Sequence, residues 1–186
     1  MMGTMHPDDV LAFWFGQERQ AWFRKDPVFD DAIRQRFLGT CEAAAESRLA
    51  DWRRTARGCL ALILVLDQFP RNLFRGQARA FATDPQAREV TRHVLEQGWD
   101  RSMTPTERMF LYLPLEHSES LSDQEQCLAL MTQISGAPET ADLPQWARAH
   151  LEIIRRFGRF PHRNAALGRE TTPEEAEFLK GPASSF

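Results

Sequence analysis

Lysine is scarce in this chain, and its cysteines are not arranged in pairs. Only Lys25 and Lys180 are lysines, so nearly all of the 23 basic residues are arginine. The three cysteines, Cys41, Cys59 and Cys127, are widely spaced and form no CxxC motif. This spacing argues against a disulfide framework or a zinc knuckle and fits a reducing compartment. We therefore expect three free thiols.

Long apolar runs are also missing. The longest run, CLALILVL at residues 59–66, is much shorter than the roughly 20 residues that a membrane-spanning helix needs. The first ten residues, MMGTMHPDDV, contain no basic region followed by an apolar stretch, so no signal peptide is expected. Together these features predict a soluble, cytoplasmic protein with no membrane partner.

Several functional signatures are absent as well. The sequence has no Walker A loop, no G-x-G-x-x-G, no H-E-x-x-H and no G-x-S-x-G. Its formal net charge is −3, which provides no overall basic field for nucleic acid. We expect neither a cofactor nor a metal, and either a monomer or a homodimer. At 186 residues the chain predicts one domain, residues 1–186.

The sequence does contain a series of capped amphipathic segments. Helical periodicity predicts about eight helices and no strand, in the ranges 6–15, 26–52, 59–69, 84–98, 104–119, 122–135, 143–158 and 171–180. The N-terminal caps are expected at Asp26, Asp84, Thr104 and Thr172, each followed by a proline at the first helical position. The length of segment 59–69 suits a strand or a helix, but no second strand-like run exists to pair with it. The predicted fold is all-α.

A first polar cluster follows the apolar run. Asp67, Arg71 and Arg75 are spaced by four residues, so their side chains share one face if the helix continues past Pro70. Because Asp67 directly follows apolar residues, we expect it to be buried and paired with an arginine, most simply Arg71. Asn72 belongs to the same candidate site.

A second cluster is PLEHSES, residues 114–120. Glu116 and Glu119 are spaced by three residues and are predicted to share a helix face, with His117 pointing elsewhere. One interpretation is an acid/base pair. Metal sites in helical bundles favour Glu-x-x-His instead, so the pattern gives little support for a metal.

A third cluster is RFGRFPHRNAALGRET, residues 156–171. Gly158 and Pro161 prevent the preceding helix from continuing, so we expect this segment to fold back toward residues 116–119. His150 lies on the apolar stripe of that helix and is predicted to face the core. The candidate ligand-binding residues here are Arg159, His162, Arg163 and Asn164.

Three interpretations of these clusters stay open. The first is a binding module whose pocket, lined by arginine, histidine and glutamate, holds a small anionic ligand or a peptide carboxylate. It depends on an excess of cations over the candidate carboxylates Asp67, Glu116 and Glu119; the candidate cations are Arg71, Arg75, Arg155, Arg159 and Arg163. The second is a small acid/base hydrolase or lyase that uses Glu116 or Glu119 with His117 or His150. The third is a purely structural network.

Motifs along nearly the whole chain carry a family resemblance. They are FWFG (13–16), WF (22–23), LDQFPRNLFRG (66–76), AFATD (80–84), FLYLPLEHSE (110–119), RFGRFPHRNAALGRETTPEE (156–175) and the final SSF. The chain resembles DUF924, a bacterial family of unknown function whose usual EHSED segment ends here in Ser120 instead of aspartate. The resemblance implies antiparallel helical hairpins in a right-handed superhelix like that of tetratricopeptide repeats. It implies no activity, substrate or catalytic residue.

Overall fold

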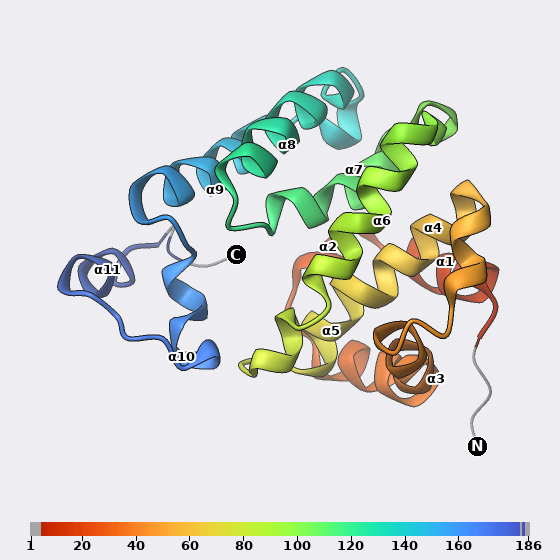
Figure 1. Cartoon of the computed structure of the whole chain (residues 1–186), viewed down its shortest axis with the longest axis horizontal. Coiled ribbons are helices and arrows are strands. Elements are labelled where there is room, and N and C mark those ends of the chain that lie inside the picture. Colours follow the sequence, from red (N-terminus) through yellow and green to blue (C-terminus); the bar gives the residue numbers. More distant parts are fainter. Residues whose placement is uncertain (1–4, 183, 185–186) are drawn as a thin grey trace.

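The computed structural model describes residues 5–182 and residue 184, and no residue in this range forms a strand. The predicted all-α fold is confirmed (Figure 1). The α-helices are α1 (Pro7–Phe15), α2 (Arg19–Phe23), α3 (Pro27–Ala45), α4 (Ala56–Ile63), α5 (Phe69–Leu73), α6 (Asp84–Gln97), α7 (Pro105–Glu116), α8 (Leu121–Ile134), α9 (Leu143–Phe157), α10 (Asn164–Leu167) and α11 (Pro173–Phe178). Short helical turns join them: η1 (Ala50–Arg54), η2 (Leu64–Gln68), η3 (Ala78–Phe81), η4 (Trp99–Ser102), η5 (Pro138–Thr140) and η6 (Pro161–Arg163).

The helices form two groups (Figure 1). Helices α1 to α6 lie on one side, and α8 to α11 lie on the other. Helix α7 connects them, because it packs against α4 and α6 of the first group and against α8 and α9 of the second. Helices α8 and α9 pack closely as consecutive neighbours. The superhelical arrangement expected from the resemblance stays a prediction.

An aromatic cluster forms the core of the first group. Trp14 of α1 is fully buried, and its ring lies 5.8 Å from that of Phe29, 5.6 Å from Phe69 and 5.4 Å from Phe110. Burial of each large aromatic side chain contributes roughly 1.5–3 kcal/mol, so this cluster anchors α3, α5 and α7 to α1. The aromatic cluster therefore fixes the positions of α5 and α7, which carry two of the polar clusters.

Cap residues define most helix ends as predicted. Asp26 accepts hydrogen bonds from the backbone N–H groups of Val28 and Phe29, and Thr104 and Thr172 each form a capping box. Asp84 is the exception. The N-cap of α6 is Thr83, and the carboxylate of Asp84 points instead to Arg71. The prediction for Asp84 is wrong because a charged partner lies within reach of its side chain.

A π-helical turn lies between α4 and α5. Segment 59–69 is buried and helical as predicted, but the Phe69 N–H bonds to Leu64 O, five residues back, across η2. Pro70 has no N–H for the carbonyl of Leu66, and the Thr83 hydroxyl donates to that carbonyl instead. The extra residue in the π turn changes the direction in which Asp67 points relative to α4.

Two further expectations concern the whole described range. Cys41, Cys59 and Cys127 are buried and form no disulfide, as predicted. No helix in residues 5–182 combines the length and the apolar character that crossing a membrane requires.

Candidate functional site

The C-terminal segment folds back onto the end of α7, as expected. Gly158 ends α9 with φ of +70°, and Pro161 begins the short turn η6, so the chain reverses there. The Phe160 N–H then donates to Glu119 at 2.8 Å, and the Arg163 guanidinium donates to the carbonyl of His117 at 2.9 Å. We call the buried contact zone formed by Asp67, Arg71, Asp84, His117 and Arg163 the polar junction.

Asp67 and His117 form a close pair in the polar junction. His117 Nδ1 lies 2.8 Å from Asp67 Oδ1, and Asp67 is fully buried. The predicted pair between Asp67 and Arg71 is confirmed at 3.3 Å. Burial alone would raise the pKa of Asp67, but Arg71 and His117 outweigh burial and hold this pKa below its usual range. The carboxylate is therefore ionised and fixes a proton on Nδ1 of His117.

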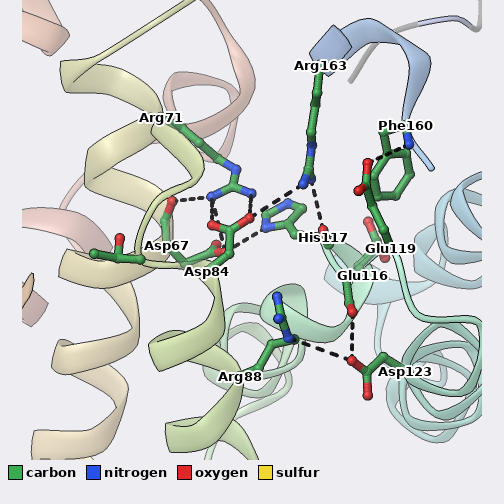
Figure 2. Close-up of polar contacts among 12 residues, drawn as sticks. Asp67, Arg71, Asp84, Arg88, Glu116, His117, Glu119, Asp123, Phe160 and Arg163 are labelled. Atoms are coloured by element: carbon green, nitrogen blue, oxygen red, sulfur yellow. Dashed lines mark hydrogen bonds and ion pairs between the residues drawn. The ribbon is translucent and has the colours of Figure 1, made fainter. Parts of the chain in front are cut away.

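Two arginines from different segments, Arg71 and Arg163, converge on Asp84 (Figure 2). Arg71 donates two hydrogen bonds to its carboxylate, at 2.9 and 3.0 Å, and Arg163 approaches it at 3.6 Å. Both guanidinium groups lie over the ring of Phe81, at 5.5 Å for Arg71 and 4.6 Å for Arg163. The segments that contain Arg71-Asn72 and Arg163-Asn164 therefore meet at the carboxylate of Asp84.

Asp123, an acid next to the polar junction, was not among the site residues predicted from the sequence. Asp123 of α8 accepts hydrogen bonds from Ser118 at 2.7 Å and from Arg92 at 2.8 Å, and Arg88 lies 3.8 Å away. Asp84, Arg88 and Arg92 follow one another at four-residue intervals on α6. This spacing was the available signal for their common face.

Glu116 points into the interior, beside the candidate residue His150 and the thiol of Cys127. Its oxygens lie 3.4 Å from His150 Nδ1 and 3.8 Å from the Cys127 thiol. Burial raises the pKa of Glu116 to about 8, opposed by the Cys127 thiol and assisted by the charge of Asp67. Burial also lowers the pKa of His150 to about 3. Near pH 7 the carboxyl is therefore protonated and the imidazole neutral.

The expected common face of Glu116 and Glu119 is not formed. Helix α7 ends at Glu116 with His117 as its C-cap, so Glu119 lies beyond the helix and points elsewhere. It accepts two hydrogen bonds from Arg169, at 2.8 and 3.0 Å, which keep the pKa of Glu119 low despite its partial burial. Glu119 is therefore paired with Arg169 and does not lie on the helix face of Glu116.

The other predicted arginines have carboxylate partners of their own. Asn72 and Arg75 bind Asp30, because α5 ends at Leu73 and Arg75 leaves the face of Arg71. Arg159 and Asn164 bind Glu175, while the exposed Arg155 pairs with Glu152 and Glu125. The expected cation excess over three carboxylates is therefore wrong. Sequence reasoning counted too few acids, because these partners come from other segments of the chain.

A solvent-open hollow of about 550 Å³ lies outside the polar junction. It is lined by Arg159, Arg169, Glu170, Thr171, Thr172 and Pro173. Its two arginines are held by Glu175 and Glu119, so neither presents an uncompensated charge to the hollow. Within the described residues, no group of three or more histidine, cysteine or acidic side chains is arranged to hold a metal.

Two polar atoms of the junction stay incompletely satisfied. Arg163 Nε is buried without a hydrogen-bond partner among the described residues, and burial together with Arg71 lowers the pKa of Arg163 to about 10. His117 is partly exposed, and its Nε2 has no hydrogen-bond partner in that same part of the chain. Burial, reinforced by the charge of Arg71, lowers the pKa of His117.

His162 directly precedes Arg163 in the sequence. Its ring is 5.7 Å from that of Phe160, and burial followed by the charge of Arg163 lowers its pKa to about 4. Three imidazoles, those of His117, His150 and His162, are therefore neutral near pH 7. A neutral imidazole can accept a proton or a hydrogen bond, which a protonated one cannot do.

Comparison with known proteins identifies the family. The family model described as a bacterial protein of unknown function (DUF924) matches residues 10–183, so the chain belongs to this family. A solved structure of a protein of unknown function, ATU0120 from Agrobacterium tumefaciens, is 40% identical with a TM-score of 0.87, over 94% of this chain and 97% of that one. No curated protein matches the chain. The resemblance inferred from the motifs is confirmed.

Proposed function

We propose that this family member binds a small anionic ligand at the polar junction, with Arg163 as the main contact. The observation that carries the proposal is the buried Arg163 Nε–H, which has no hydrogen-bond partner in the part of the chain that the structure describes. Leaving a buried donor unsatisfied costs roughly 1–3 kcal/mol, and more when the group is charged. A carboxylate or phosphate oxygen at Nε would remove this cost through a charge-assisted hydrogen bond.

The charges around the polar junction are compatible with an anion. Within the junction two arginines face two carboxylates, and one positive charge in excess appears when the neighbouring Asp123 is counted with Arg88 and Arg92. The arginines are Arg71, Arg88, Arg92 and Arg163, and the carboxylates belong to Asp67, Asp84 and Asp123. Glu116 does not cancel this charge, because its raised pKa keeps it protonated near pH 7. A monoanion would balance this larger set of charges.

A structural network remains the competing account, and the chain offers a matched pair of variants to separate the two. Arg163→Gln removes the proposed contact. Arg159→Gln removes an arginine of the outer hollow that Glu175 already holds with two hydrogen bonds, at 2.7 and 2.9 Å. Each variant is compared with the wild type in thermal-shift titrations of acetate, phosphate and citrate.

The proposal predicts a saturable stabilisation of the wild type by at least one anion. At a hundred times Kd this amounts to roughly 2.7 kcal/mol. Arg163→Gln should abolish the stabilisation, and Arg159→Gln should retain it. Equal stabilisation of all three proteins would contradict the proposal, and so would the absence of stabilisation at millimolar anion. Short peptides with a free or an amidated C-terminus then show whether a peptide carboxylate serves as the anion.

A further inference from the structure

We infer that His117 is a general base that activates a water molecule for hydrolysis of an anionic ester bound beside Arg163. The inference rests on the proposed function for the charge of the substrate only. The base itself is defined by the contacts of His117.

The orientation of the imidazole comes from Asp67. The Nδ1–H bond of 2.8 Å to Asp67 Oδ1 places the proton on Nδ1 and leaves the lone pair on Nε2. Asp67 cannot turn away, because Gln68 donates to its other oxygen at 2.6 Å and Arg71 approaches the first at 3.3 Å. A carboxylate fixed in this way also stabilises the imidazolium that forms when Nε2 takes a proton.

The side chain of His117 is partly accessible to solvent. The side chain of His117 is 16% exposed, whereas Asp67 behind it is fully buried. Figure 2 shows the ring between the guanidinium group of Arg163 and the carboxylates of Asp67 and Asp84. A substrate anion held by Arg163 would therefore place its neighbouring atoms close to the ring.

The nucleophile is water, because the nearby hydroxyl and thiol groups are engaged elsewhere. The Ser118 hydroxyl donates to Asp123 at 2.7 Å, and the Cys127 thiol is buried against Tyr112 O and Glu116. In the proposed step, Nε2 takes a proton from water while the water oxygen forms a bond to the ester carbonyl carbon. Collapse of the tetrahedral intermediate breaks the bond to the alkoxide or phenoxide, which receives the proton from Nε2.

The test compares two nitrophenyl acetates, one uncharged and one whose ring carries a carboxylate. The variant His117→Asn keeps an amide N–H near the position of Nδ1, so the bond to Asp67 persists while Nε2 is lost. General-base catalysis contributes roughly a hundredfold or more, and this factor should disappear for both esters. His6→Asn, which removes a largely exposed histidine at the N-cap of α1, outside the polar junction, should leave both rates unchanged.

Arg163→Gln separates this inference from the proposed function. If both hold, this variant slows only the carboxylated ester. If it slows neither ester while His117→Asn slows both, anion binding fails and the general base stands. Wild-type rates in His117→Asn, with its fold verified by circular dichroism, would overturn the general base. Nitrogen-15 NMR gives a second readout that needs no ester: a proton found on Nε2 of His117 at neutral pH would also overturn it.

Discussion

Two short segments of similar sequence, FPRN at residues 69–72 and FPHRN at residues 160–164, reach the same carboxylate with different results. Arg71 of the first donates two hydrogen bonds to Asp84 and one to the carbonyl of Asp67. Arg163 of the second donates one hydrogen bond to a carbonyl, lies 3.6 Å from Asp84 and has a buried Nε–H with no hydrogen-bond partner among the described residues. Arg71 therefore makes three hydrogen bonds to protein groups, and Arg163 makes one.

The asparagines that follow these arginines behave alike. Asn72 shares Asp30 with Arg75, and Asn164 shares Glu175 with Arg159. Each segment is thus held by an acid from a different part of the chain. The main difference between the two segments therefore lies in the bonds of Arg71 and Arg163 at the polar junction.

The largest expected effect is a difference in stability between variants of Arg71 and Arg163. Arg71→Gln leaves Asp67 and Asp84 buried without their main cation, and should destabilise the protein by roughly 3–5 kcal/mol. Arg163→Gln removes one carbonyl bond and a long ion pair, and should cost about 1 kcal/mol. Urea unfolding measures both free energies. Equal losses would show that the two arginines are equivalent structural groups and would break the comparison.

The Asp67→Asn variant should approach the Arg71→Gln effect. It removes the negative charge shared by Arg71 and His117 in a fully buried site, at a cost of roughly 3–5 kcal/mol. Asp142→Asn is the control, because its pair with Arg19 is largely exposed and should contribute less than about 1 kcal/mol. A melting curve of Asp67→Asn that overlays the wild type would contradict the burial of this carboxylate.

The pH dependence of stability tests the buried groups near the polar junction, which are Glu116, His150 and His162. Because the pKa of Glu116 is raised to about 8, the unfolded chain loses this proton first, and stability falls as pH rises from about 4.5 to about 8. The lowered pKa values of His150 and His162 act in the opposite direction, so stability falls as pH drops below about 6.5. Maximum stability is expected near pH 6.5.

Glu116→Gln isolates the first of these contributions. The neutral amide cannot ionise, so the decline in stability between pH 6.5 and 8 should disappear. At pH 8 the free energy of unfolding of the variant should exceed that of the wild type by a few kcal/mol, since each unit of pKa shift corresponds to roughly 1.4 kcal/mol. Below the ordinary glutamate pKa the variant and the wild type should converge. Chemical denaturation at each pH provides the measurement, and a parallel alkaline decline in the variant would assign the decline to other groups.

A smaller difference is expected between the two asparagines. Asn164 is buried, donates to Glu175 and Thr171 and accepts from Arg169, whereas Asn72 has one side-chain bond, to Asp30. Asn164→Ala should therefore cost roughly 1–3 kcal/mol and Asn72→Ala about 1 kcal/mol. The reverse order in urea unfolding would mean that the first segment depends more on its asparagine anchor.

The sequence predicted more of the helices than of the site. Periodicity and proline-marked caps located the eight main helices, because both signals are local. Helices α2, α5 and α10 were missed, since five, five and four residues are too few for a period to appear. The pair between Asp67 and Arg71 was predictable from its four-residue spacing and its place after an apolar run.

The other contacts in the site form between segments that lie apart in the sequence and meet only in the folded chain. Asp84 was interpreted as a cap because Asp-Pro is a common helix start, and only the folded chain brings Arg71 and Arg163 to it. The end of α7 separates Glu116 from Glu119, which a spacing rule for continuous helix could not include. Likewise, the acids that balance Arg75 and Arg159 lie 45 and 16 residues away along the chain.

The most direct test of the unequal pairing is the response of the arginine Nε–H resonances to added phosphate in nitrogen-15 NMR. We predict a saturable shift for the buried Nε–H of Arg163 and a smaller shift for that of Arg71, because the two Nη atoms of Arg71 already bind Asp84 and so neutralise its guanidinium charge. Arg159→Gln should leave the response of Arg163 intact. An Arg163 resonance that does not respond to phosphate, or that responds no more than Arg71, would contradict the account.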